Sequence, residues 1–499
     1  MEPIRSDLSL KRVAGRTAKQ AVMESDIPMP AGQSVERILS VQGEINNQIG
    51  RCLHAQIEAE GTLTLDLLCL NKENIPFGMR ASTQYNHTLP MENVEEGMEA
   101  TVKPQMLDLR CALRDGRLKM DAVVELNAVA MQEEAMPVLT DVAGAPGLQT
   151  QYVDADVGDL KFIGAQGLRM HETLPAPGVQ QVLLSCAKVQ VNGVEVLDGD
   201  VNVMGTLFTS ILYVDENAQY THLNQQIPMQ GTINVDLDAR DCENVIANAR
   251  VEEVNVALNP EPGMLDMDVA VRLEAQCIKN MRVHTLCDAY MSNGCLKCTQ
   301  QRVEQLNSIA GASRACNYTE VVRLPETLPD AFRAIYATAR PTTLGLVNDN
   351  GNLAVEGIFI TTVCYQTDDG QIVGFEEDVP FSCTLDAPYA PDADVDVQML
   401  EVRTSGSGRL LNVAYMVETK AVLRELVHVN VAVDVEETEP AQRENGILVS
   451  YAAAGEGFWD VGKRYGATQE QLRGWNPELN EPFCEGQAVL ILSTRGRKK

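Results

Sequence analysis

The chain has 499 residues, of which 45% are hydrophobic and 22% are charged. This composition is typical of folded globular proteins, and the length predicts three or four domains, because one hydrophobic core rarely serves more than about 250–300 residues. The formal net charge is −30, from 70 acidic and 40 basic residues. So acidic a surface repels phosphate groups, which argues against nucleic acid as a partner and disfavours adsorption to anionic membranes.

No segment of the sequence suggests a membrane span or a secretory signal. Apolar runs stay below the roughly 18 residues of a transmembrane helix, and the N-terminal segment lacks an apolar core. The 13 cysteines are odd in number and irregularly spaced. We therefore expect no direct membrane insertion, and reduced thiols in a cytosol-like compartment at the site of synthesis.

A sequence pattern recurs three times, beginning at Gly61, Gly205 and Gly357. An apolar run follows each glycine, and a polar turn follows each run. Each copy then has a proline between two apolar residues: Leu89-Pro90-Met91, Ile227-Pro228-Met229 and Val379-Pro380-Phe381. A glycine inside a strand pattern indicates a bulge or a close approach of another backbone, so we expect one of these at each repeat glycine.

Each copy also contains a late strand that follows a second glycine, at Gly116, Gly263 and Gly408. Apolar residues alternate with other residues in all three strands, as in Leu118, Met120, Ala122, Val124 and Leu126 of the first copy. Alternation of period two predicts a strand with one buried face. The expected fold is mainly β: three tandem antiparallel repeats of the sandwich or barrel type.

The expected boundaries place the three repeats at residues 1–140, 161–280 and 281–435. Residues 140–160, rich in glycine and aspartate, are expected to form a flexible acidic linker. The segment that leads into the third repeat contains four cysteines: Cys287, Cys295, Cys298 and Cys316.

The C-terminal residues 446–495 differ in kind from the repeats. Gly466 is expected as the C-cap of one short helix, and Thr468 with Gln471 forms a capping-box pattern for a second helix that stops at Asn476-Pro477. With a strand on either side, the expected order is βααβ. Four residues are expected to supply most of its small core: Trp459, Tyr465, Leu472 and Trp475.

This C-terminal unit resembles a LysM domain in the segment SYAAAGEGFWDVGKRYGATQEQLRGWNPELN and the closing EGQAVLIL. The resemblance implies a groove that binds N-acetylglucosamine in peptidoglycan or chitin. Transferred to this chain, one side of the groove is Gly455, Glu456, Gly457 and Phe458, and the other is Asn476, Pro477, Glu478 and Leu479. Phe458 and Leu479 are the expected exposed apolar contacts. Because Gly457 replaces the usual threonine, a protein partner is the other interpretation.

The repeats resemble the SPOCS domain of spore-coat proteins, in the opening LSLKRVAGRTAKQAVMESDIPMP, the EGTLTLDLLCL strand and Asp288-Ala289-Tyr290. The resemblance implies a non-enzymatic adaptor in spore-coat morphogenesis. Such a protein is made in the mother-cell cytoplasm and then moves to the forespore surface, where its LysM domain docks to the coat-basement ATPase. Other coat proteins and a second copy of the chain are further candidate partners. The alternative function is binding of peptidoglycan in the cortex or cell wall.

The sequence shows no catalytic constellation, and we expect neither enzymatic activity nor a cofactor. Its six histidines are dispersed, and no nucleophile or phosphate-binding motif occurs. A four-thiolate zinc site at Cys287, Cys295, Cys298 and Cys316 is the one metal hypothesis. The irregular spacing favours unrelated thiols instead.

Overall fold

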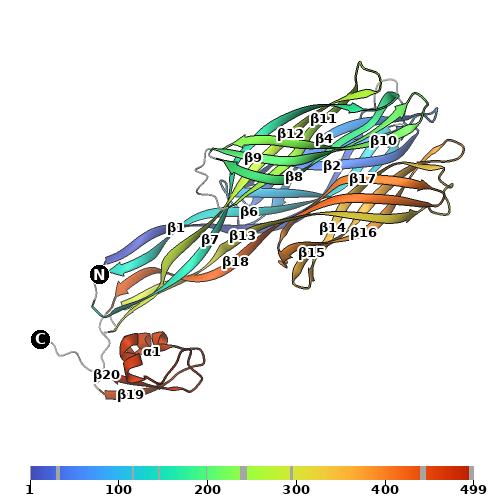
Figure 1. Cartoon of the computed structure of the whole chain (residues 1–499). Coiled ribbons are helices and arrows are strands. Elements are labelled where there is room, and N and C mark those ends of the chain that lie inside the picture. The colour runs from blue at the N-terminus through green and yellow to red at the C-terminus, as the bar shows by residue number, and fades with distance from the viewer. Residues whose placement is uncertain are drawn as a thin grey trace.

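The structure is a computed structural model, and it describes residues 2–29, 34–114, 117–143, 146–197, 199–235, 244–292, 296–438 and 446–493. The fold is mainly β, as predicted, with about 78% strand and two short helices near the C-terminus. Three similar units of six strands precede a small C-terminal module (Figure 1).

The first repeat is an antiparallel sheet in the order β1-β6-β5-β2-β3-β4. Its strands are β1 (Glu2–Ile27), β2 (Arg37–Leu53), β3 (Gln56–Leu70), β4 (Pro76–Pro90), β5 (Glu99–Arg114) and β6 (Arg117–Ala143). A single residue pair, Arg51 with Glu99, joins its two halves.

The second and third repeats have the same strand pairing, divided into two three-stranded sheets each. In the second repeat the sheets are β10-β9-β8 and β11-β12-β7. Its strands are β7 (Leu148–Pro175), β8 (Val179–Leu197), β9 (Asp200–Asp215), β10 (Tyr220–Asn234), β11 (Asn244–Leu258) and β12 (Met264–Met291).

The third repeat has the sheets β14-β15-β16 and β13-β18-β17. Its strands are β13 (Leu296–Arg323), β14 (Arg333–Asp349), β15 (Asn352–Gln366), β16 (Ile372–Pro388), β17 (Asp394–Ser407) and β18 (Leu410–Glu437).

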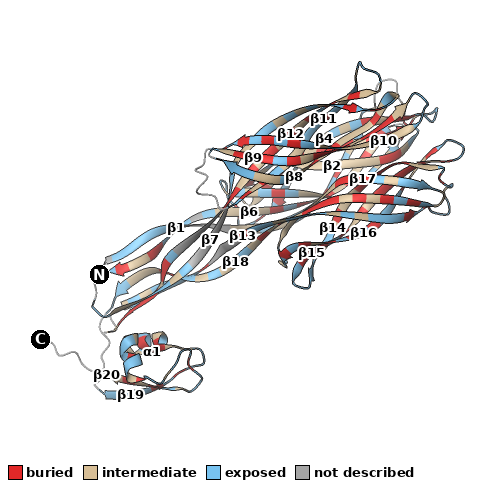
Figure 2. Cartoon of the chain, in the orientation of Figure 1, coloured by how far each residue is buried: buried red, intermediate tan, exposed pale blue. Residues whose placement is uncertain are grey.

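Each repeat has its own hydrophobic core. Figure 2 shows buried residues, in red, along the strands of the repeats. In β6 the predicted apolar face is buried as expected, from Leu118 through Leu126. The corresponding residues of β12 and β18, such as Leu265 and Leu411, are fully buried as well. The sequence periodicity therefore predicted the inward face of these strands correctly.

The three repeat glycines lie where another backbone approaches closely. A Cβ atom on Gly61 would lie 2.1 Å from the Asn46 carbonyl oxygen, and one on Gly357 would lie 2.3 Å from that of Thr342. In each repeat the neighbouring strand has a register shift directly after the glycine's partner. The expectation of a close approach or bulge is confirmed, and both occur.

The first and last strands of each repeat pair along their whole length and extend beyond the rest of the repeat. Their far ends form what we call the stem: residues 2–13, 131–143, 148–162, 276–291, 296–306 and 426–437. Figure 1 shows these strands running together toward the N-terminus. Apolar residues from all three repeats pack inside it, including Leu139, Leu286 and Ala432.

The expected linker at residues 140–160 is therefore wrong. These residues form the end of β6, a turn and the start of β7, in so far as the structure describes them. Likewise, β12 and β13 occupy most of residues 281–320. Polar side chains do not prevent the backbone of these segments from pairing as strands. The burial that stabilises these paired strand ends comes from strands that are distant in sequence. The units consequently run from β1 to β6, β7 to β12 and β13 to β18.

We call the part of each repeat outside the stem its head. The three heads form a closed cycle, in which an edge strand of each head packs against the next repeat. The contacts are β4 with β8, β10 with β14, and β16 with β2. A shared apolar cluster fills the centre, and Leu39, Leu183 and Ile335 occupy equivalent positions in it, equally far ahead of the repeat glycines. Because the cycle closes, each repeat has its contact surfaces covered by its two neighbours, as the subunits of a cyclic trimer do.

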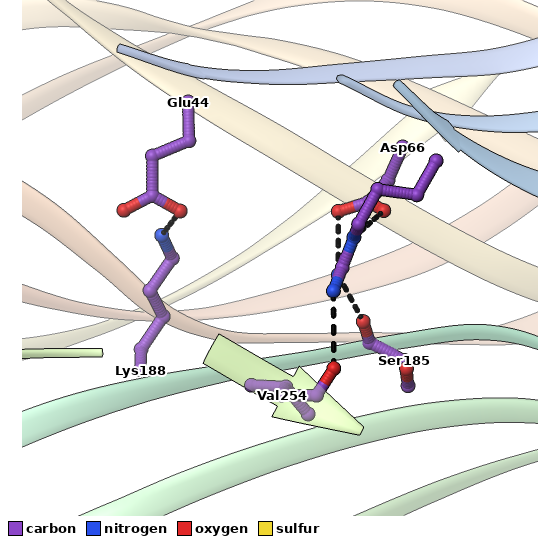
Figure 3. A network of polar contacts seen from close by, with 6 residues as sticks. Glu44, Asp66, Ser185, Lys188 and Val254 are labelled. Carbon is purple, nitrogen blue, oxygen red and sulfur yellow. Dashed lines mark hydrogen bonds and ion pairs between the residues drawn. The ribbon is translucent and has the colours of Figure 1, made fainter. Parts of the chain in front are cut away.

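Polar contacts accompany this packing between the first two repeats (Figure 3). The Arg80 guanidinium forms two hydrogen bonds with Asp66, at 2.6 and 3.1 Å, and donates to the Ser185 and Val254 carbonyls of the second repeat. Lys188 contacts Glu44 across the same interface at 2.5 Å. Planar guanidinium donors suit such a convergence of acceptors, so Arg80 ties two repeats together.

The C-terminal module comprises β19 (Gly446–Tyr451), α1 (Phe458–Tyr465), α2 (Gln469–Trp475) and β20 (Ala488–Ser493). The observed order is βααβ, as predicted. Gly466 closes α1 in a left-handed conformation, with φ of 61°, and Thr468 and Gln471 form the predicted capping box of α2. The two strands pair antiparallel.

Candidate functional site

The stem ends in three aspartates at equivalent positions, one on the last strand of each repeat: Asp141, Asp288 and Asp434. The first strand of each repeat also has a residue at an equivalent position. It pairs with the residue two positions before the aspartate of its own repeat: Arg5 with Leu139, Tyr152 with Leu286, and Gln300 with Ala432. Each of these residues reaches the last strand of the preceding repeat in the cycle: Tyr152 contacts Asp141, Arg5 contacts Asp434, and Gln300 contacts Cys287, next to Asp288.

Two of the three aspartates are satisfied within the stem. Tyr152 donates its hydroxyl to Asp141 at 2.7 Å, and Arg5 donates to Asp434 at 2.6 Å. At the third position Gln300 donates instead to the Cys287 carbonyl, at 2.9 Å. The neutral amide of Gln300 thus leaves the Asp288 carboxylate to another partner.

That partner is helix α1 of the C-terminal module. Lys463 Nζ lies 2.7 Å from both carboxylate oxygens of Asp288, and the indole nitrogen of Trp459 donates to the same carboxylate at 2.9 Å. The Asp288 side chain is 8% exposed, whereas that of Asp434 is 44% exposed. A buried carboxylate needs a charged or hydrogen-bonding partner. The Ala289 amide of the stem donates to Asp288 at 2.9 Å, and the charged partner comes from the module.

Tyr290 completes this contact. Its hydroxyl donates to the Ala467 carbonyl at 2.9 Å, and its ring meets Trp459 edge to face at 4.9 Å. Burial, and then the charge of Asp288, raise the pKa of Tyr290 to about 12, so its hydroxyl keeps its proton. Gly462 permits the approach, because a Cβ atom there would lie 2.3 Å from the Tyr290 oxygen.

The expected core residues of the module fall into three places. Leu472 is fully buried, and Tyr465 and Trp475 pack partly buried against the same cluster. Trp459 faces the stem instead. Phe458, which we expected as an exposed groove contact, is 2% exposed and packs edge to face on Phe483.

The groove implied by the LysM resemblance is occupied by the module's own side chains. Glu481 accepts a hydrogen bond from the Phe458 amide at 2.6 Å and pairs with Arg473 at 3.0 Å. A Cβ atom on Gly457 would lie 2.6 Å from the same Glu481 oxygen. The helix N-terminus, the natural donor to an incoming acceptor, is therefore already satisfied by a carboxylate.

Two other groove residues hold the module together. Asn476 is 8% exposed; it donates to the Leu472 and Leu490 carbonyls and accepts from the Leu490 amide. Glu456 accepts from the Ala453 amide and pairs with Arg464, and the pKa of Glu456 is lowered by these two contacts.

The remaining predicted groove residues lie at or near the surface. Pro477, Glu478 and Gly455 are exposed, and Leu479 packs partly against the module's core.

Strand β19 presents an apolar surface to solvent. Ile447, Val449 and Tyr451 alternate along it and are 75%, 49% and 71% exposed, and Leu448 between them is 43% exposed. Such a row of apolar side chains on a two-stranded sheet is a typical protein-binding surface. The sequence analysis predicted only a strand here, because the exposure of its side chains depends on how the rest of the module packs.

The proposed zinc ligands do not come together. Cys295 lies outside the described residues. Cys287 approaches the Gln151 carbonyl, whereas Cys316 lies 3.0 Å from Cys383. Across the described ranges, no group of three or more potential metal ligands occurs. Cys277 is disulfide-bonded, which differs from the expectation of reduced thiols throughout.

Comparison with known proteins gives one match. Residues 178–259, which contain β8 to β11, match the family model described as SipL, SPOCS domain. No curated protein and no solved structure matches the chain. Within the described part of the chain, no helix has the length and apolar character needed to cross a membrane. The second repeat is thus similar to the SPOCS domain of a non-catalytic sporulation family, which supports a role related to the spore coat.

Proposed function

We propose that the chain is a non-enzymatic adaptor in spore-coat assembly whose C-terminal module docks to the coat-basement ATPase at the forespore surface. The observation that carries the proposal is the combination of a SPOCS-like body with a terminal module whose apolar strand β19 faces solvent. The stem holds the module at Lys463 of α1 and at Ala467, through Asp288 and Tyr290. This arrangement fits a protein that presents a binding surface at the end of a long support.

The β19 surface suits a protein partner better than a sugar. Ile447, Val449 and Tyr451 offer alternating side chains to an added strand or an apolar patch. The module's LysM-like groove, in contrast, has its amide donor at Phe458 taken by Glu481. Binding an acetamido group there would first require the loss of that charge-assisted hydrogen bond.

Capture of the purified coat ATPase tests the proposal. The full chain should capture it, and a chain lacking residues 447–499 should not. An Ile447→Lys, Val449→Lys double variant should also lose capture, while Glu470→Lys, on the exposed side of α2, should retain it. Equal capture by the full and the truncated chain would count against the ATPase as the partner.

Binding of peptidoglycan through the groove is the second candidate, carried by the LysM resemblance. Sedimentation with purified peptidoglycan separates the two functions. The adaptor function predicts that the chain stays in the supernatant. Sedimentation that Glu478→Ala weakens and Ile447→Lys leaves intact would favour the glycan function.

Localisation follows from the same proposal. We expect synthesis in the mother-cell cytoplasm, followed by accumulation around the forespore and in the spore coat. A fluorescent fusion imaged during sporulation should change from diffuse to a ring around the forespore. The ring should be lost when residues 447–499 are removed.

A further inference from the structure

The two sheets of the third repeat meet along a seam between β13 and β16, which are edge strands of their sheets. Three residues of β13, spaced two apart, contact three consecutive residues of β16. Arg314 donates to the Thr384 carbonyl at 2.5 Å, and Tyr318 donates its hydroxyl to the Ser382 carbonyl at 2.9 Å. Between these contacts, the sulfur atoms of Cys316 and Cys383 are 3.0 Å apart.

Only the third repeat has thiols at both of these positions. Cys316 pairs with Val417, and the equivalent residues of the other repeats are Ala21, opposite Val124, and Leu168, opposite Val271. Counted from the repeat glycines, the residues equivalent to Cys383 are His87 and Gly231. In the second repeat these positions also touch, because a Cβ atom on Gly231 would lie 3.4 Å from Leu168.

We propose that Cys316 and Cys383 are oxidised to a disulfide that joins the two sheets of the third repeat. A separation of 3.0 Å is shorter than ordinary side-chain contact, and it leaves about 1 Å to the bonded distance of roughly 2.05 Å. The flanking bonds from Arg314 and Tyr318 hold the two strands together, so the bond forms without separating or shifting them. Cys277, in the second repeat, is already disulfide-bonded, so the chain accommodates oxidised cysteines.

The oxidant is a low-molecular-weight disulfide, RSSR, which reacts by thiol–disulfide exchange. Cys316 is partly exposed, and its thiolate attacks one sulfur of RSSR to form a mixed disulfide and release RS⁻. Cys383 is 2% exposed, so its sulfur reaches only its neighbour, and it attacks the Cys316 sulfur and expels the second RS⁻. The two released RS⁻ ions take up the protons that the two cysteines lose. RSSR is thereby reduced to two RSH, and the two cysteines are oxidised to the disulfide.

Burial raises the pKa of Cys383 to about 11, which keeps this residue protonated at neutral pH and slows the attack by its sulfur there. Formation of the disulfide should therefore accelerate as the pH is raised from 7 toward 9.

Treatment of the full chain with oxidised glutathione, followed by alkylation and peptide mass spectrometry, tests the proposal. The expected result is a peptide pair linked through Cys316 and Cys383, reversible by a phosphine reductant, with an upward shift in Tm. In Cys383→Ser, the Cys316 residue should retain a glutathione adduct. The control Cys364→Ser alters a buried thiol of the same repeat and should leave the linked pair intact.

Two outcomes would overturn the proposal. One is a wild-type chain in which both residues remain open to alkylation after unfolding, and the other is a stable glutathione adduct on Cys316 with Cys383 unlinked. Both are measured on the wild-type chain, so a folding defect in a variant changes neither of them.

Discussion

Asp288 and Lys463 form an ion pair between the stem and the C-terminal module, with Nζ 2.7 Å from both carboxylate oxygens. The pair exists because the cycle of repeats is not perfectly symmetric. Arg5 and Tyr152 satisfy the equivalent aspartates, whereas Gln300 does not reach Asp288 with a charged or phenolic donor. The presence of Gln300, where the other repeats have Arg5 and Tyr152, thus leaves Asp288 available to bind the module.

Replacing Asp288 with Asn should loosen this docking. The amide keeps the shape of the side chain but removes the charge that faces Lys463, at a cost of about 1–2 kcal/mol. Trp459 should then become more exposed. Since both tryptophans of the chain, Trp459 and Trp475, lie in the module, a Trp475→Phe background makes fluorescence report Trp459 alone. A red shift is expected, and Asp434→Asn should give none.

Gln300→Arg should release the module by competition. Arg5 donates to Asp434 from the equivalent position, so an arginine at 300 is placed to donate to Asp288 and displace Lys463. The same fluorescence assay should show a red shift, and hydrogen exchange near Tyr290 should increase. Gln300→Met, of similar length but without charge, should leave the emission unchanged; a red shift there as well would contradict the competition mechanism.

Gly205→Ala should destabilise the second repeat by about 2 kcal/mol or more. The new Cβ atom would lie 2.5 Å from the Gln190 carbonyl oxygen and 2.9 Å from Met229. The Gln190 backbone cannot move away without disturbing its strand, so the thermal midpoint of unfolding should fall. Gly345→Ala is the matched control, because no atom lies within 4 Å of its added Cβ, and calorimetry should find it near neutral.

His222 should make stability depend on pH. Burial, and then the charge of Arg403, lower the pKa of His222 from 6.5 to about 4, and the ring packs edge to face on Tyr336 of the next repeat. Between pH 6.5 and 4 the unfolded chain binds a proton here and the folded chain does not. Stability is therefore full above pH 6.5 and falls as the pH drops toward 4, by up to about 3 kcal/mol.

The measurement for His222 is urea unfolding at several pH values in wild type and His222→Gln. The variant should lose part of the slope between pH 6.5 and 4, while its stability above pH 7 gives the cost of the substitution itself. Identical slopes would show that this histidine does not titrate as described.

Asn476→Ala should unfold the C-terminal module rather than alter a binding surface. The substitution removes three hydrogen bonds, two of which connect the end of α2 to Leu490 of β20, and it takes these side-chain partners from the Leu490 amide and carbonyl. The expected loss is about 3 kcal/mol, visible as a lower tryptophan-monitored melting temperature. Asn480→Ala, at an exposed position, should melt like wild type; a normal melt for Asn476→Ala would instead restore it as a groove residue.

Features that depend on neighbouring residues were predicted from the sequence, whereas features that depend on distant residues were not. Alternation at Leu118 and Leu265 predicted which face of each late strand is buried, because side-chain direction follows the backbone period. The capping box at Thr468 and the turn at Gly466 depend on neighbouring residues and were found correctly. The Phe458 side chain was misplaced, because its burial depends on Phe483 across the module.

The sequence by itself determined that the chain is built of β repeats followed by a βααβ module, since periodicity, caps and turn glycines act over a few residues. Only the tertiary structure decided that residues 140–160 join a stem, that three heads close into a cycle, and that Asp288 receives Trp459 and Lys463. The same holds for the meeting of Cys316 with Cys383. These contacts join segments far apart in the chain, and their register is set by packing of the whole molecule rather than by local conformational preference.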